Sequence, residues 1–252
     1  MPNLPQTRYF QNLDDMSLAA ARFVAEEAER SAAERGAFTL ALSGGSTPRR
    51  LYERLAQPPF VGAFPWPQTH LFWGDERFVP PNHADNNAAM ASHALIRGAP
   101  IPPQNVHPIR TDAATPEIAA AEYEAVLREY LRLFDPRSAA AGVPVFDVIL
   151  LGMGDDGHTA SLFPGSPALT ERTRWAAAAP MPQIAPFAPR VTLTLPLINA
   201  AKAVLFLISG AKKRAILREI LDHADAAQAR YPAARVQPNG RCVWLVAEEG
   251  GF

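Results

Sequence analysis

A short apolar run that passes directly into a glycine-rich loop, residues 145–164, constrains the fold more than any other part of the chain. It reads V-F-D-V-I-L-L-G-M-G-D-D-G-H-T-A-S-L-F-P. A run rich in β-branched residues is typical of a parallel strand covered on both faces. Glycines at the end of such a strand let a ligand approach the backbone, and titratable side chains beside them can perform acid–base chemistry. The candidate residues in this loop are Gly152, Gly154, Gly157, Asp155, Asp156 and His158.

Predicted helices and strands alternate along the chain, which indicates a three-layer α/β fold with a mostly parallel, Rossmann-like sheet and helices on both faces. The predicted strands are 38–42, 69–73, 106–109, 145–151, 190–195, 203–209 and 241–246. The predicted helices are 14–35, 48–55, 88–96, 116–133 and 211–221. Asp14 is expected to cap the first helix and Gly36 to end it, and residues 74–87 are expected to form a long polar loop. No repeat or linker divides the chain, so we predict one α/β domain over residues 1–252.

The composition excludes several classes of protein. The hydrophobic share of 48% and the charged share of 19% are those of a globular protein, and the net charge is −1. No basic stripe indicates nucleic acid, and no long apolar run indicates a membrane. Cys242 is the one cysteine, so no internal disulfide can form, and the N-terminus lacks the pattern of a signal peptide. We therefore expect a cytoplasmic protein with a buried, structural thiol.

The segment 42–48, L-S-G-G-S-T-P, combines two glycines with two hydroxyls at the start of a predicted helix. Exposed backbone N–H groups at a helix N-terminus make an anion nest that suits a phosphate monoester. The pattern is not a Walker loop, which requires G-x-x-x-x-G-K-[ST]. A plain tight turn with a capping Ser or Thr is the alternative interpretation of this segment.

Three further segments place charged groups at strand ends. Asp75 and Arg77 follow one predicted strand, and the alternatives for them are a ligand site or a surface ion pair. A lone histidine is more often structural than catalytic, but the glycines and aspartates around His158 favour catalysis. Arg190 and the pair Lys212/Lys213 could meet a phosphate dianion or stay solvated. The glycines of the His158 loop have dinucleotide-like spacing, but no long helix follows, so no nucleotide cofactor is predicted.

Taken together, these motifs resemble the 6-phosphogluconolactonase family. The matching motifs are S-G-G-S-T-P, G-D-E-R, G-M-G-D-D-G-H-T-A-S-L-F-P-G, R-V-T-L-T and S-G-A-K-K, in the family's order, over about residues 40–217. The resemblance implies the fold of sugar-phosphate isomerases and deaminases, shared with glucosamine-6-phosphate deaminases and ribose-5-phosphate isomerases. It implies hydrolysis of 6-phospho-D-glucono-1,5-lactone to 6-phospho-D-gluconate, the second step of the oxidative pentose phosphate pathway.

The resemblance also implies roles for particular residues. The predicted catalytic residues are His158, Asp75 and Arg77. The predicted substrate-binding residues are Ser43, Gly44, Gly45, Ser46, Thr47, Gly154, Asp156, Gly157, Arg190 and Lys213. Lys212 is expected to be a solvated neighbour, and no metal or cofactor is expected. One departure is Asn86, which stands where the family usually has Ser; an amide can still form hydrogen bonds there.

The expected mechanism is general acid–base catalysis by neutral His158, with Arg77 or loop N–H groups stabilising the oxyanion and Asp75 orienting Arg77 or His158. The alternatives are a deaminase-like sugar-phosphate isomerase and a sensor that binds without turnover. Deaminases resemble this chain around D-G-H but carry a glutamate five residues after that histidine, where Phe163 stands here, and a tyrosine at the position of Arg77. The expected partner is a small sugar-phosphate lactone, without nucleic acid or membrane, and the protein is expected to be a monomer or small homo-oligomer.

Overall fold

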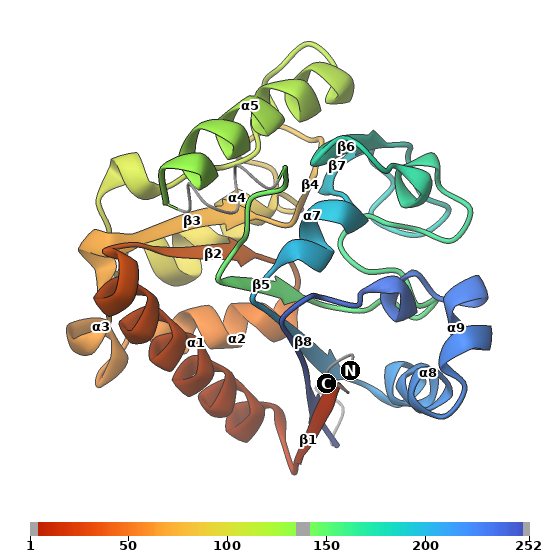
Figure 1. The fold of residues 1–252 in the computed structure, drawn as a ribbon, viewed down its shortest axis with the longest axis horizontal. Coiled ribbons are helices and arrows are strands. Elements are labelled where there is room, and N and C mark those ends of the chain that lie inside the picture. The colour runs from red at the N-terminus through yellow and green to blue at the C-terminus, as the bar shows by residue number, and fades with distance from the viewer. Residues whose placement is uncertain (1–4, 135–141, 249–252) are drawn as a thin grey trace.

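A six-stranded sheet forms the centre of the protein (Figure 1). The computed structural model describes residues 5–134 and 142–248. In spatial order the strands are β1 (Gln6–Phe10), β9 (Arg241–Ala247), β8 (Ala203–Ser209), β5 (Val148–Leu151), β2 (Phe38–Leu42) and β3 (Thr69–Trp73). All neighbouring strands run parallel, which confirms the predicted Rossmann-like sheet. The edge strand β1 was not predicted, because its sequence, Q-T-R-Y-F, is largely polar; none of its five residues is buried.

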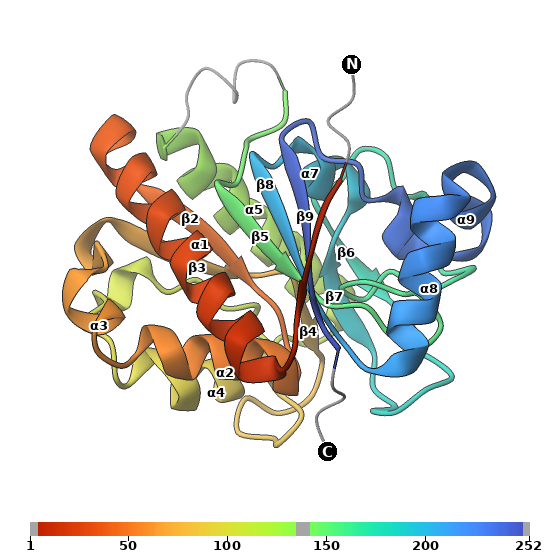
Figure 2. The ribbon, with the colours of Figure 1, turned by 90° about the horizontal axis from the view of Figure 1, so that it is seen from below.

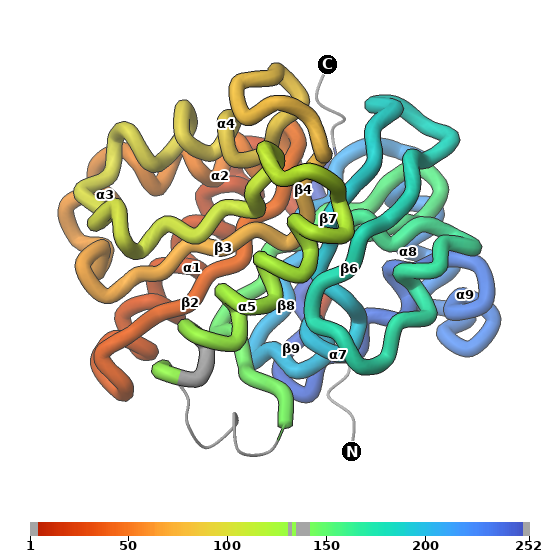
Figure 3. Tube along the Cα trace, turned by 90° about the horizontal axis from the view of Figure 1, so that it is seen from above, coloured from red at the N-terminus to blue at the C-terminus, as the bar shows by residue number. Residues whose placement is uncertain are grey.

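Helices cover both faces of this sheet, as predicted. Figure 2 shows α1 (Leu13–Arg35), α2 (Ser46–Leu55) and α8 (Ala211–Asp222) on one face. Figure 3 shows α5 (Pro116–Phe134) and α7 (Leu195–Ala200) on the other, together with a second sheet. The shorter helices are α3 (Phe60–Ala63), α4 (Asn87–Ala91) and α9 (Ala224–Arg230), with 3₁₀ turns at Trp66–Gln68, Pro103–Asn105, Pro167–Thr170 and Pro232–Arg235 and a π turn at Ser92–Ile96. In the part of the chain that the structure describes, no helix has the length and apolar character needed to cross a membrane.

The second sheet is small and antiparallel, in the order β4 (Asp75–Arg77), β7 (Arg190–Leu193) and β6 (Ala176–Ala179). The prediction of a loop over the whole of residues 74–87 is therefore wrong at its start. The strand Asp75–Arg77 has only three residues, all charged, so no apolar alternation reveals it. Its pairing with β7 places Arg77 opposite Arg190.

Several predicted boundaries also need correction. The cap of α1 is Asn12, whose side chain accepts a hydrogen bond from the N–H of Asp15, and not Asp14; Gly36 ends the helix with a positive φ, as predicted. The predicted strand 106–109 is reduced to a single bridge between Val106 and Leu71. The strand predicted at 145–151 begins at Val148. The strand predicted at 190–195 ends at Leu193, because α7 begins at Leu195 with a proline in its first turn.

The order of the strands defines where a ligand can enter. From β2 the chain moves outward to β3, whereas from β5 it moves in the opposite direction to β8 and β9. The neighbouring strands β2 and β5 therefore flank a topological switch point, where a crevice opens at their carboxyl ends. Ser43 follows β2 directly and Gly152 follows β5, so the two glycine loops of the sequence meet at this crevice.

Candidate active site

A cavity of about 260 Å³ lies at the switch point and contains most of the predicted site. Its lining comprises Ser43, Gly44, Gly45, Ser46, Thr47, Pro48, Asp75, Arg77, Gly152, Met153, Gly154, His158, Ala160, Ala185, Leu207 and Lys213. All three predicted catalytic residues are among these. Of the predicted binding residues, Asp156, Gly157 and Arg190 lie outside the lining. The cavity therefore combines an acid–base group, two cations and a glycine-rich wall.

His158 is held by its own loop. Its Nδ1 lies 2.5 Å from Oδ1 of Asp156, and its backbone N–H donates to the same oxygen at 3.1 Å. Burial acts to raise the pKa of Asp156, but the hydrogen bonds from His158 outweigh it, and the pKa lies below its usual value. An ionised carboxylate accepts the Nδ1 proton, so Nε2 is left with a free lone pair. A side chain at Gly154 would overlap the imidazole, which explains the glycine there.

Asp75 is bound to a serine that was not predicted as part of the site. The Ser161 hydroxyl donates to Oδ2 of Asp75 at 2.6 Å, and the Ser161 N–H donates to Oγ1 of Thr192 on β7 at 3.2 Å. Asp75 was expected to orient Arg77 or His158, but within the described residues it makes no hydrogen bond with either side chain. Ser161 is fully buried and joins the catalytic loop to the second sheet.

Arg77 lies on the same face of β4 as Asp75, because side chains two residues apart point the same way. Its Nη1 donates to the backbone oxygen of Asp85 at 2.9 Å. Glu76 points away from the cavity and accepts from the backbone N–H groups of Arg77, Asn87 and Ala88 at 2.7–2.8 Å. Burial raises the pKa of this carboxyl to about 7. Glu76 thus ties the start of α4 to β4 and fixes the loop that holds Arg77.

The wall formed by residues 43–47 is positioned by a buried tyrosine. The Tyr52 hydroxyl accepts from the N–H of Ser43 at 2.9 Å and donates to the oxygen of the same residue at 2.8 Å. Gly45 has φ 107°, and α2 begins at the next residue, so the N–H groups of Ser46 and Thr47 belong to its first turn. These N–H groups have no acceptor within the helix and can bind an anion. Phosphate binding by this segment stays a prediction.

The two lysines differ as expected. Lys213 lines the cavity from the first turn of α8. The side chain of Lys212 is 81% exposed and lies 4.0 Å from Asp155 at the surface. Lys213 is thus placed to meet an anion in the cavity, and Lys212 is not.

Arg190 and Gly157 serve the scaffold in this structure. Arg190 is buried and donates to the backbone oxygens of Pro186 and Ala188 at 2.7 and 3.1 Å, and burial lowers its pKa. It anchors the loop that brings Ala185 to the cavity; its direct contact with phosphate stays a prediction. Gly157 has φ 78°, and a side chain there would overlap Tyr231.

The supporting residues that were missed include Ser161, Glu76 and Tyr123. Ser161 and Glu76 lie inside the matching motifs, so their position beside His158 and Asp75 was a signal for both. Tyr123 was indistinguishable from an ordinary core residue of a helix. Its hydroxyl accepts from the N–H of Trp73 at 2.7 Å and donates to the oxygen of that residue at 2.9 Å. Asn86 replaces the usual serine and caps α4 through a 2.8 Å hydrogen bond from the N–H of Ala89.

An acid–base pair in a cationic cavity at the switch point of an α/β sheet is the arrangement of an enzyme that acts on a small anionic molecule. Comparison with known proteins defines it further. The chain matches the family described as Glucosamine-6-phosphate isomerases/6-phosphogluconolactonase over residues 11–244. It is 46% identical over 223 residues to a protein of Synechocystis sp. named 6-phosphogluconolactonase, covering 88% of this chain and 87% of that protein. This chain therefore belongs to that family.

Solved structures agree with the family assignment. The 6-phosphogluconolactonase from Trypanosoma brucei superposes with a TM-score of 0.83 at 33% identity, with 97% of each chain covered. A monomeric glucosamine-6-phosphate deaminase superposes with a TM-score of 0.78 at 18% identity, covering 97% of this chain and 98% of the deaminase. The second likeness concerns the fold alone, and it confirms the expected fold shared with deaminases.

Proposed function

We propose that this protein hydrolyses 6-phospho-D-glucono-1,5-lactone to 6-phospho-D-gluconate, the second step of the oxidative pentose phosphate pathway. The observation that carries the proposal is the His158–Asp156 pair beside a cavity that also holds Arg77 and Lys213. A lactone is an activated ester, so its hydrolysis needs a base, an oxyanion stabiliser and a means of positioning the substrate. The residues of this cavity can supply all three. The proposal is also supported by two relatives, 46% and 42% identical to this chain, that are named 6-phosphogluconolactonase.

In the proposed reaction, Nε2 of His158 takes a proton from a water molecule as its oxygen attacks C1 of the lactone. The Asp156 carboxylate holds the Nδ1 proton and stabilises the imidazolium that forms. The negative charge that develops on the carbonyl oxygen is stabilised by Arg77 or by N–H groups of the glycine loop. When the bond from C1 to the ring oxygen breaks, His158 returns the proton to that oxygen. The new carboxylic acid then loses its proton to solvent.

The phosphate supplies binding energy at a distance from the reacting carbon. We assign it to the nest of residues 43–47 and to Lys213, which face the same cavity from α2 and α8. A helix N-terminus and a lysine both favour a dianion. Asp75, which accepts a hydrogen bond from Ser161, lies in the same lining as Arg77.

Phe163 argues against a deaminase. Its ring centroid lies 4.4 Å from that of His158, where the resemblance places a glutamate in deaminases. An apolar ring cannot move a proton, so a relay through that position is absent here. The ring of Phe163 instead packs against the imidazole of His158. The same intact acid–base pair argues against a sensor that only binds.

We further propose that the protein acts in the cytoplasm on a free small molecule, as a monomer or small homo-oligomer and without nucleic acid. The near-neutral net charge of −1 supports the absence of a polyanionic partner. Cys242 is buried, and burial raises the pKa of its thiol to about 12, in keeping with a structural thiol.

The test is hydrolysis of freshly generated 6-phosphogluconolactone above its spontaneous rate, with unphosphorylated gluconolactone as the control substrate. We expect acceleration confined to the phosphorylated lactone. His158→Asn should keep the fold and lower kcat by about 10²-fold or more. No acceleration by the folded protein would refute the proposed function, and near-normal turnover by the variant would remove His158 from the mechanism.

A further inference from the structure

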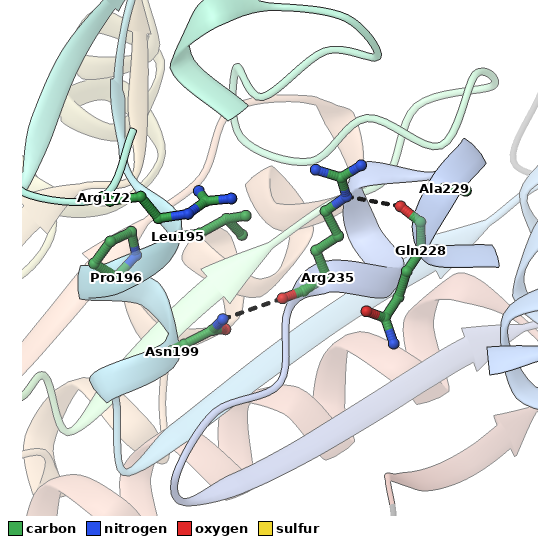
Figure 4. Close-up of a pocket in the computed structure, with 7 residues that line it drawn as sticks. All are labelled: Arg172, Leu195, Pro196, Asn199, Gln228, Ala229 and Arg235. Atoms are coloured by element: carbon green, nitrogen blue, oxygen red, sulfur yellow. Dashed lines mark hydrogen bonds between the residues drawn. The ribbon is translucent and has the colours of Figure 1, made fainter. Parts of the chain in front are cut away.

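A second cavity, of about 500 Å³, lies between α7 and α9 and shares no lining residue with the first (Figure 4). It is bounded by Arg172, which follows the 3₁₀ turn Pro167–Thr170, and by Arg235 at the end of the turn Pro232–Arg235. Its volume is in the range of small-molecule sites. The proposed reaction makes no use of this cavity.

The two arginines give the cavity a positive charge that no carboxylate in its lining balances. Within residues 5–134 and 142–248, neither guanidinium forms an ion pair with Asp or Glu, whereas many other arginines of the chain do so. Figure 4 shows both guanidinium groups projecting into the opening between α7 and α9. Two unbalanced cations that share one opening create a field that attracts an anion.

Arg235 is held in place by its neighbours before any ligand arrives. Its Nε donates to the backbone oxygen of Gln228 at 2.7 Å, which orients the guanidinium. Because this bond uses Nε, the two Nη groups can donate to a ligand. The backbone of the same turn is fixed by Asn199, whose amide donates to the oxygen of Arg235 at 3.1 Å and accepts from the N–H of Gln237 at 2.8 Å. A guanidinium fixed in this way loses little freedom on binding an oxyanion.

Arg172 forms the opposite wall and is exposed to solvent. Its Nη1 donates to the backbone oxygens of Glu171 and Leu169 at 2.9 and 3.3 Å, so Nη2 is available to a ligand. Leu195 contributes an apolar surface beside the two cations. The site thus has a charged end for an oxyanion and a wall for carbon atoms.

We propose that this cavity is a second anion site that binds a small organic phosphate. Two guanidinium forks match the charge of a phosphate dianion and offer donors to its three oxygens, more than a single carboxylate can accept. The site is separate from the catalytic cavity, so its occupation does not depend on the proposed hydrolysis.

The test is an amide NMR titration of the full chain with glycerol 3-phosphate at low ionic strength. We expect shifts of the Asn199 and Gln228 side-chain amides and of the Ala229 N–H, separate from shifts of Ser46 and Thr47 at the catalytic cavity. Citrate at equal concentration should cause smaller shifts of the Asn199, Gln228 and Ala229 signals than glycerol 3-phosphate does. Absence of these shifts, or an equal response to citrate, would overturn the proposal.

The variant Arg172→Gln/Arg235→Gln should lose the shifts around Asn199 while those at Ser46 and Thr47 and the lactonase activity remain. The matched control is Arg22→Gln/Arg218→Gln, which removes the same charge from exposed positions on α1 and α8 and should bind as the wild type does. Arg172→Gln alone, which alters only an exposed side chain, should weaken binding about tenfold. Unchanged binding by both arginine variants would show that the ligand lies elsewhere.

Discussion

At the scale of single residues, the side chains of the candidate site divide into those that line the cavity and those that hold them. His158, Arg77 and Lys213 face the cavity, and their motifs revealed them in the sequence. The partners that hold them were harder to find. Asp156 was predicted as a binding residue, and that role stays a prediction; its contact with His158 was not predicted, because only the folded loop brings its carboxylate to Nδ1.

The first prediction concerns this pair. Asp156→Asn should lower kcat by about 10²- to 10⁴-fold with a small change in KM, because an amide can donate to Nδ1 and stabilise the wrong tautomer. Steady-state kinetics on the phosphorylated lactone measure the effect. Asp155→Asn is the matched control, since that neighbouring side chain is 60% exposed and should be silent. A kcat for Asp156→Asn equal to that of the control would mean that the carboxylate does not support His158.

The second prediction separates the adjacent lysines. Lys213→Ala should raise KM by about 10- to 100-fold, because it removes one charged contact to the phosphate, with a smaller effect on kcat. Lys212→Ala should behave as the wild type, since its side chain is at the surface. Equal effects of the two substitutions would place the phosphate away from α8.

At the scale of secondary-structure elements, the long periodic segments were predictable and the short paired ones were not. Helix α1 has Met16, Ala20, Val24 and Ala28 every four residues, all buried, so its pattern is clear. Strand β4 is three charged residues, and its existence depends on β7, which is more than a hundred residues away in the chain. Pairing of that kind is set by tertiary structure, so no local pattern can reveal it.

The third prediction tests how β4 and α4 are joined. Glu76→Ala should lower the free energy of unfolding by about 3 kcal/mol, because one buried and two part-buried N–H groups lose their acceptor. Urea unfolding followed by circular dichroism gives the value. Glu53→Ala is the control; that carboxyl pairs with Arg49 at the surface, and its loss should change stability by less than about 0.5 kcal/mol. Similar values for both variants would contradict the assigned role of Glu76.

At the scale of the whole molecule, we propose that the chain is a single domain. The first described strand, β1, pairs along its length with the last, β9, so segments far apart in the described residues belong to one sheet. The site likewise draws residues from the loops that follow β2 and β5 and from α2, β4 and α8. Urea unfolding should therefore give coincident transitions by tryptophan fluorescence and circular dichroism.

The fourth prediction is the pH dependence of that stability. His70 and His107 lie with Nδ1 and Nε2 3.1 Å apart, and burial lowers the pKa of each from 6.5 to about 4. Their folded pKa lies below the unfolded one, so their stabilising effect is complete above pH 6.5 and is lost as the pH falls towards 4. His70→Gln/His107→Gln should flatten this decline in urea-unfolding measurements. An unchanged pH profile would exclude the pair as its cause.

Glu76 acts in the opposite direction over an overlapping range. Its pKa is raised by burial from 4.5 to about 7, so its contribution is complete below pH 4.5 and is lost as the pH rises through 7. Glu76→Gln keeps the shape of the side chain and should remove this second slope while leaving the histidine slope in place. The histidine double variant and Glu76→Gln thus report on separate parts of the curve of unfolding free energy against pH.

The pairing of β1 with β9 has a consequence for how the protein is made. Strand β1 is synthesised more than two hundred residues before its partner β9, so it stays unpaired until β9 has left the ribosome. The His158 loop also lacks a supporting contact until Ala233 has been synthesised, because the N–H of Ala233 donates to the oxygen of Gly157. A chain released before these residues emerge has neither a closed sheet nor a supported catalytic loop. We therefore expect activity only after β9 has been synthesised.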